Sequence, residues 1–217
     1  MLTHPYPGFF VDIEGIDGAG QTTQVTLIAE RLKEEGFKTA VTRAATKDTP
    51  IGGLIRQALN HQLKISIPTL EFLFAADHSE RQEKEIEPVL EKSGIVLADR
   101  SIWSFVAFGA LAADEEWLFS LAKNLYFPDL TIFLHVSPHV ALKRIMTSRP
   151  LRELFEKEQT LIKVWQNYEK LAKEFSDKIV VIDGEKPIPV VTEEILRIIK
   201  ENPKFKTLNT KQIQNFK

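Results

Sequence analysis

The chain has 217 residues, and 28 Lys and Arg side chains against 30 Asp and Glu side chains leave a net charge of −2. This length with 43% hydrophobic and 27% charged residues is typical of a globular protein, and the near-neutral balance provides no basic field for nucleic acid. Zero cysteines exclude disulfides and thiol catalysis, and residues 1–8 lack a signal-peptide pattern. No run reaches the ~18 apolar residues of a membrane span, so we expect a soluble, cytoplasmic protein with no membrane or nucleic-acid partner.

Short apolar runs alternate with segments of helical spacing along the chain. Residues 9–14 read as a strand that runs into Gly15, and apolar residues from Val25 to Leu32 then recur at helical spacing until Gly36. Further strands are expected at 39–42, 95–98, 130–136 and 179–182. Further helices are expected at 51–63, from 68 to about 90, and at 102–112, 115–125, 138–147, 161–175 and 191–199.

This alternation predicts an α/β fold with a doubly wound, five-stranded parallel sheet and helices on both faces. The sequence shows neither a repeat nor an internal linker, so residues 1–200 are expected to form one domain. Residues 201–217 are polar and contain four lysines. They are expected to be a solvated, partly disordered tail.

A glycine-bearing segment between the first strand and the first helix carries the strongest chemical signal. It reads Gly15-Ile16-Asp17-Gly18-Ala19-Gly20-Gln21-Thr22-Thr23. Glycines allow the backbone to approach a phosphate closely, and the helix behind them adds its positive dipole end. The segment matches the G-x-x-x-x-G-K-[ST] phosphate loop except at the lysine, where Gln21 stands. It predicts a phosphate loop of P-loop NTPase type that binds ATP, with Thr22 as a ligand of Mg²⁺.

The missing lysine lowers the charge of the expected phosphate site. A glutamine amide donates hydrogen bonds without charge, so the loss should be about 1–2 kcal/mol in nucleotide binding. The loss in catalysis is expected to be larger, since removing an electrostatic donor typically reduces the rate by about 10²–10³-fold.

Several further motifs resemble the thymidylate kinases, a family of nucleoside monophosphate kinases, over nearly the whole chain. The opening Glu14-Gly15-Ile16-Asp17-Gly18-Ala19-Gly20, the segment Leu73-Phe74-Ala75-Ala76-Asp77, and Asp99-Arg100 with Ser104, Ala107 and Phe108 carry the resemblance. Pro128-Asp129-Leu130-Thr131 and Ala141-Leu142-Lys143-Arg144-Ile145 extend it. The resemblance implies transfer of the γ-phosphoryl group from ATP to dTMP, with Mg²⁺ as cofactor, and a homodimer.

Six positions depart from the family pattern. Gln21 replaces the lysine, Ala44-Ala45 replace a Glu-Pro pair, His78 replaces the arginine that reaches the thymine, Ser101 replaces an aromatic residue and His135 replaces an acid. They motivate two alternatives: a nucleotide-binding protein with weak or no kinase activity, and a kinase for another pyrimidine monophosphate. A histidine within the apolar strand around residue 135 is expected to be a core residue.

On the ATP side, the resemblance implies that the loop from Gly15 to Thr23 holds the phosphates. Thr22 and Asp99 would hold Mg²⁺, although a carboxylate before a helix is also typical of a cap. Arg144 and Arg149 flank an expected lid around residues 148–153, which would close over ATP and replace the charge missing at Gln21. A solvated basic turn is the alternative reading of this segment, and Lys47 is another candidate for the missing charge.

On the acceptor side, Arg100 would bridge the donor and acceptor phosphates, Arg43 would hold the acceptor phosphate and Asp17 would accept from its sugar. A surface salt bridge is the alternative reading for Arg100 and a local turn for Asp17. The expected base pocket consists of Phe74, His78, Ser104 and Phe108. The two phenylalanines are also compatible with core packing, and His78 with a surface position.

Overall fold

The computed structural model describes residues 1–148 and 154–214. A five-stranded parallel sheet occupies its centre, in the order β3-β4-β2-β6-β7. Its strands are β2 (Phe9–Glu14), β3 (Thr39–Arg43), β4 (Ile95–Asp99), β6 (Leu130–His135) and β7 (Ile179–Asp183). This sheet confirms the doubly wound α/β class expected from the sequence.

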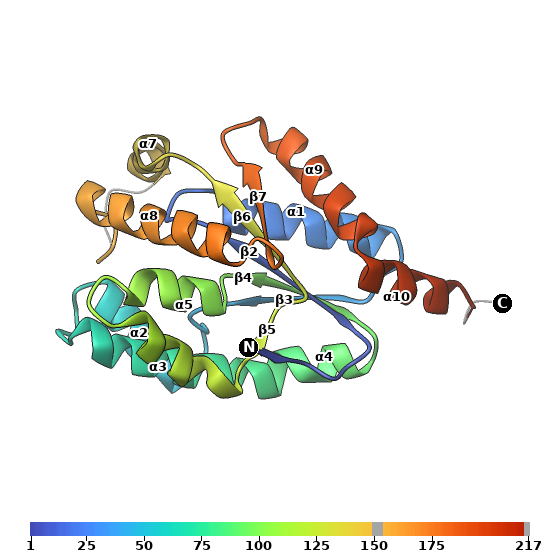
Figure 1. Ribbon diagram of the computed structural model, residues 1–217, viewed down its shortest axis with the longest axis horizontal. Helices are drawn as coiled ribbons and strands as arrows, with labels where there is room; N and C mark the ends of the chain where they lie inside the picture. Colours follow the sequence, from blue (N-terminus) through green and yellow to red (C-terminus); the bar gives the residue numbers. More distant parts are fainter. Residues whose placement is uncertain (149–153, 215–217) are drawn as a thin grey trace.

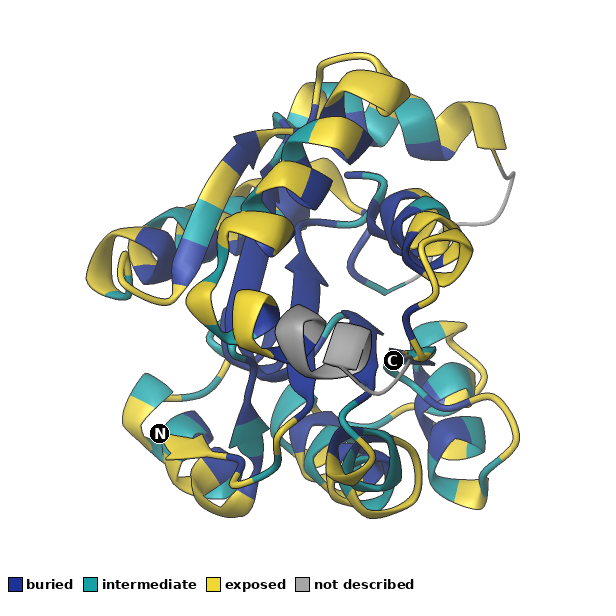
Figure 2. Cartoon of the chain, turned by 90° about the vertical axis from the view of Figure 1, so that its right-hand side faces the viewer, coloured by how far each residue is buried: buried dark blue, intermediate teal, exposed yellow. Residues whose placement is uncertain are grey.

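The sheet is most deeply buried at its middle strands. Every residue of β2 and β4 is buried, whereas most residues of the edge strands β3 and β7 are partly or fully accessible. Figure 2 shows the same contrast between dark central strands and helices that are exposed on their outer sides. A parallel strand covered on both faces needs a continuous apolar run, which Ile95-Val96-Leu97-Ala98 supplies.

Helices cover both faces of the sheet (Figure 1). The main ones are α1 (Gln21–Glu34), α2 (Pro50–Leu59), α3 (Ile67–Arg81), α4 (Glu87–Glu91), α5 (Ile102–Gly109), α6 (Glu115–Leu121), α7 (Pro138–Ser148), α8 (Glu158–Glu174), α9 (Ile188–Glu201) and α10 (Pro203–Gln214). Helices α1 and α9 pack together on one face, while α3, α4 and α5 lie on the other and α8 packs on α5. Among the described residues, no helix is long and apolar enough to cross a membrane.

The long helix expected from residue 68 to about 90 is interrupted. Between α3 and α4, residues Gln82–Ile86 form a π-helical turn. A second, two-stranded parallel sheet pairs β1 (Leu2–Thr3) with β5 (Tyr126–Phe127), and strands this short leave no periodicity by which to predict them. His135 is also not a core residue, since its side chain at the end of β6 is 39% exposed and lies 3.4 Å from Glu169.

The expectation of a solvated tail after residue 200 is wrong. Residues Pro203–Gln214 form α10, and Phe205 and Leu208 are buried in the core. The Phe205 ring lies 5.9 Å from Phe9 and 5.0 Å from Phe37, measured between centroids. Three large apolar residues among many polar ones, Phe205, Leu208 and Ile213, formed too weak a pattern to predict this helix.

An ionic cluster joins α10 to the start of the chain. The Asp129 carboxylate lies 2.8 Å from His4 Nε2 and 2.7 Å from Lys204 Nζ, and it accepts from the Phe10 N–H at 2.9 Å. Burial by itself raises the pKa of Asp129, but hydrogen bonds from His4 and Lys204 more than offset burial and hold this pKa below 3.8. The ionised carboxylate therefore stabilises the folded chain.

Replacing Asp129 by asparagine is expected to lower the free energy of unfolding at pH 7 by about 1.5–3 kcal/mol, because hydrogen bonds to a charged group contribute about that much. Since the folded-state pKa is the lower one, the stabilisation is present above the unfolded-state pKa. It is lost as the pH falls through the folded-state pKa. The difference between the wild type and D129N in urea unfolding should therefore shrink on acidification. D177N, at a 74% exposed side chain, is the control; an equal loss there would contradict the prediction.

Candidate active site

The segment after β2 forms a loop that wraps the start of α1. Gly18 and Gly20 have φ angles of +83° and +103°, a region that glycine enters without penalty. A Cβ atom on Gly18 would stand 2.5 Å from the Ala141 carbonyl oxygen, so this position also needs glycine for space. The first N–H groups of α1 have no partner within the helix and are available to an anion, as a phosphate loop requires.

The Gln21 side chain is tied back into this loop. Its amide nitrogen donates to the carbonyl oxygens of Gly15 at 2.7 Å and Ile16 at 3.1 Å, and the side chain is buried. An amide has two N–H groups, so both are engaged by the loop backbone. Gln21 thus holds the loop in shape from inside.

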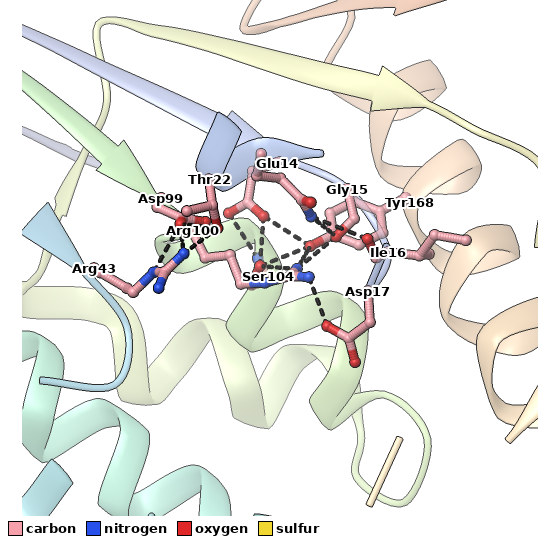
Figure 3. A network of polar contacts seen from close by, with 11 residues as sticks. Glu14, Gly15, Ile16, Asp17, Thr22, Arg43, Asp99, Arg100, Ser104 and Tyr168 are labelled. Carbon is pink, nitrogen blue, oxygen red and sulfur yellow. Dashed lines mark hydrogen bonds and ion pairs between the residues drawn. The ribbon is translucent and has the colours of Figure 1, made fainter. Parts of the chain in front are cut away.

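Thr22 and Asp99 meet at the mouth of the loop, although they come from α1 and β4. The Thr22 hydroxyl donates to Asp99 Oδ2 at 2.7 Å, and Arg43 Nε donates to the same oxygen at 2.7 Å (Figure 3). A side-chain cap at the start of α5 is absent, so Asp99 is not the helix cap that was its alternative reading. A hydroxyl and a carboxylate side by side are oxygen ligands of the kind that Mg²⁺ takes.

Arg100 lies between the phosphate loop and the acceptor side. One guanidinium nitrogen donates to Asp17 Oδ1 at 2.8 Å and another to the Gly15 carbonyl, and the side chain is only 17% exposed. Its backbone has a φ of +74°, a left-handed conformation that is uncommon for a non-glycine residue and concentrates at functional sites. Burial opposes the charge on Arg100, but Asp17 and other nearby acids raise its pKa above the ordinary value. Because both side chains of the Arg100–Asp17 pair are mostly buried, this pair is not the surface salt bridge of the alternative interpretation.

The fully buried carboxylate of Glu14 supports this arrangement from the protein interior. It accepts from the Ser104 N–H at 3.0 Å and from the Tyr168 hydroxyl at 2.7 Å (Figure 3). It also accepts from the Ser101 N–H at 2.9 Å. Burial and the adjacent Glu14 raise the pKa of Tyr168 well above 10, so its hydroxyl remains a donor. Glu14 thereby joins β2, α5 and α8 beneath Arg100.

Two cavities open on either side of Arg100. The larger one, of about 750 Å³, is lined by the loop residues Asp17 to Gln24 and by cationic side chains. Those cations are Arg43, Lys47, Arg56, Arg100, Arg144 and Lys186. The smaller cavity, of about 140 Å³, is mainly apolar and lies between α3 and α5. Asp17 and Arg100 line both cavities.

The smaller cavity gathers the residues expected around the acceptor base. Phe74, His78, Ser104 and Phe108 all line it, and the Arg100 guanidinium lies 5.1 Å from the centre of the Phe108 ring. His78 is buried rather than on the surface, and burial and the nearby Arg81 lower its pKa to about 3. It is therefore a neutral imidazole at physiological pH.

Of the two arginines expected to flank the lid, the described part of the chain includes Arg144. Arg144 on α7 donates to the carbonyl oxygens of Ala19 at 3.2 Å and Gly184 at 3.1 Å, so it borders the larger cavity. Thr23 lines that cavity as well. Arg149 and the expected lid beyond Ser148 lie outside the described residues.

Three residues at the site had no assigned role in the sequence analysis. Glu14 and Tyr168 belong to the buried network, and Glu71 lines the smaller cavity. A carboxylate at the last position of a short strand, directly before the phosphate loop, was the available signal for Glu14. Glu71 lies on α3 next to Gly109 of α5. Its burial could not be predicted from the local sequence pattern.

Comparisons with known proteins agree with this geometry. The thymidylate kinase family profile matches residues 13–195. A probable thymidylate kinase of Pyrococcus abyssi is 34% identical over 89% of this chain and 96% of its own length. A thymidylate kinase of Caldanaerobacter subterraneus is 30% identical over the same shares. The structure of thymidylate kinase from Candida albicans superposes with a TM-score of 0.77 at 25% identity, covering 91% of this chain and 93% of its own. The chain belongs to the thymidylate kinase family.

Proposed function

We propose that the chain is a nucleoside monophosphate kinase that transfers the γ-phosphoryl group of ATP to dTMP, giving dTDP and ADP. The observation that carries the proposal is the position of Arg100 and Asp17, which line both the phosphate-loop cavity and the apolar cavity. Phosphoryl transfer depends mainly on alignment and charge neutralisation. A guanidinium between two substrate cavities serves both needs.

On the ATP side, the N–H groups of the loop and of the first turn of α1 would bind the phosphates. Gln21 acts as a positioning residue, because its amide hydrogens are engaged by Gly15 and Ile16. The positive charge that a loop lysine would supply would come from neighbouring cations, of which Arg100, Arg144 and Lys47 line the same cavity. Arg149, from the expected lid, remains a further candidate.

The residues at the mouth of the loop fit a magnesium ion. Thr22 and Asp99 would hold it, and when bound it would neutralise charge on the phosphates of ATP. Arg43 presently bonds the same Asp99 oxygen, so we infer that it exchanges this partner for the acceptor phosphate. Its exposed position, with 39% of the side chain accessible, leaves it room to do so.

On the acceptor side, Phe74 and Phe108 would enclose the base, and Arg100 would reach from the base cavity to the phosphate. Asp17 orients Arg100 and lies close enough to the cavity to accept from the sugar hydroxyl. A second candidate, transfer to another pyrimidine monophosphate, is favoured by the neutral His78 in the place of a charged side chain.

The test is ADP formation from Mg-ATP with dTMP and with a panel of other nucleoside monophosphates. Turnover fastest with dTMP is the expected result. A preference for another pyrimidine monophosphate would favour the second candidate. ATP binding without turnover of any monophosphate would overturn the kinase proposal and favour a nucleotide-binding role.

Replacing Gln21 by lysine is expected to tighten ATP binding by at least about tenfold. The amide hydrogens of Gln21 are engaged by the loop, whereas the lysine would add a charge-assisted hydrogen bond to the phosphates, which contributes about 1.5–3 kcal/mol. Titration calorimetry with a non-hydrolysable ATP analogue measures this change. Gln21→Met is the matched variant, and loss of the two bonds to the loop should weaken binding. Unchanged affinity in Q21K would show that charge at this position does not limit ATP binding.

We also propose a homodimer. A ring at the surface of α3 supports it: Phe72 is 55% exposed, and its ring centroid lies 5.3 Å from that of the half-buried Trp117 on α6. Light scattering coupled to size exclusion is the measurement, and a monomer at micromolar concentration would contradict the proposal. The cytoplasmic location stays a prediction.

A further inference from the structure

Two buried polar side chains in the smaller cavity have no hydrogen-bond role in the proposed mechanism. Glu71 lines the cavity and is fully buried, and neither carboxyl oxygen has a hydrogen-bond partner among the described residues. Nε2 of His78, in the same cavity, is likewise buried and unpartnered there. Unpaired buried polar atoms are costly, so a cavity with several of them is suited to a ligand that supplies the missing partners.

These groups share one face of α3. Glu71, Phe74 and His78 follow at intervals of three and four residues, the spacing that places side chains on one side of a helix. All three line the cavity, so the ring expected to contact the base lies between the two polar groups. Gly109 of α5 allows this close approach, since a Cβ there would stand 3.2 Å from the Glu71 carboxyl carbon.

The carboxyl group is neutral under physiological conditions. Burial raises the pKa of Glu71 to about 8. The other titratable or charged groups that line the cavity are Asp17, His78, Arg81 and Arg100. Asp17 and Arg100 bond each other, Arg81 donates to the Thr42 hydroxyl at 3.0 Å, and His78 is neutral. A protonated carboxyl group offers one O–H donor beside one carbonyl acceptor.

We propose that Glu71 determines the base specificity of this kinase by forming paired hydrogen bonds with the imide edge of a pyrimidine. The carbonyl of the carboxyl group would accept from the ring N–H, and its O–H would donate to the neighbouring ring carbonyl. This inference rests on the proposed function and deepens it. A site that hydrogen-bonds a polar edge rejects ligands that lack it, because its own buried groups are then left unpaired.

Two substitutions separate hydrogen bonding from packing. Glu71→Gln keeps a donor beside an acceptor and should leave the KM for dTMP within about threefold of wild type. Glu71→Leu removes both and should raise that KM by about 10–100-fold, with the kcat and the KM for ATP changed less than threefold. Glu91→Gln, at an exposed position at the end of α4, is the control for removal of a charge. An unchanged KM for dTMP in E71L would overturn the proposal.

The pH profile distinguishes this role from a merely structural one. Ionisation of Glu71 above about pH 8 removes the donor, so the wild-type KM for dTMP should rise between about pH 7 and 9, where the substrate phosphate no longer titrates. E71Q should show no such rise. Identical profiles for wild type and E71Q would overturn the proposal even if E71L fails to fold.

Direct binding keeps the two proposals apart. Calorimetric titration of dTMP into wild type, E71Q and E71L needs no turnover. Weaker binding to E71L with normal binding to E71Q supports the role of Glu71 even in a chain that transfers no phosphate. Equal binding to all three overturns that role even if wild type turns over dTMP rapidly.

Discussion

Replacing Arg100 by glutamine is expected to lower kcat/KM for dTMP by about 10²–10³-fold, the usual effect of removing one preorganised electrostatic donor. The guanidinium bonds Asp17 and the Gly15 carbonyl, and a neutral amide can match neither its charge nor its span. Arg100→Lys should keep part of the activity, because lysine retains the charge but lacks the planar fork. Steady-state rates of ADP formation measure both effects.

The matched control for this substitution is Arg31→Gln, since Arg31 is half-exposed on α1 and pairs with the exposed Glu193. It should leave kcat/KM within about twofold, as surface ion pairs contribute little. Thermal unfolding of R100Q separates lost chemistry from lost structure. Activity of R100Q within about fivefold of wild type would remove Arg100 from the proposed mechanism.

Replacing Phe205 by alanine is expected to lower the free energy of unfolding by about 3–5 kcal/mol, as deletion of a buried aromatic side chain typically does. The ring is 2% exposed and fills the space between Phe9 and Phe37. Phe9 is the first residue of β2, and the phosphate loop follows the last residue of that strand, Glu14. The catalytic rate at temperatures below the unfolding transition should therefore change little. Urea unfolding gives the stability and ADP formation gives the rate.

Thr207→Ala on the same helix is the control, because Thr207 is exposed and its hydroxyl donates back to the Pro203 carbonyl of the same helix. Its effect should remain within about 0.5 kcal/mol. A loss below about 1 kcal/mol in F205A would mean that α10 contributes little to the stability of the folded chain.

The central sheet could be predicted because its signals are local. Each strand is a short apolar run bounded by turn residues or helical spacing, and the alternation of strands and helices by itself implies parallel pairing. The phosphate loop could be predicted equally well, because its glycines stand at fixed offsets between a strand and a helix. The opposite holds for α10, whose Phe205 gains its role in the core from contact with Phe9 and Phe37, residues far away in the chain.

Within the candidate site, residue types were predictable and their partners were not. Asp99 next to Arg100 marked the end of a central strand, but the sequence could not show that Thr22 and Arg43 would bond the same carboxylate oxygen. Gln21 was recognised as a missing charge, whereas its engagement with the Gly15 and Ile16 carbonyls depends on how the loop closes.

The fold class, the phosphate loop and the family could therefore be predicted, because each rests on motifs whose residues lie near one another in the chain. Packing between distant segments places Arg100 between two cavities and buries Glu71 and His78 in the smaller one. Burial, cavity shape and shifted pKa values arise from packing between segments far apart in the chain. The local sequence pattern does not show which segments will pack together, and the base specificity that we propose for Glu71 depends on that packing.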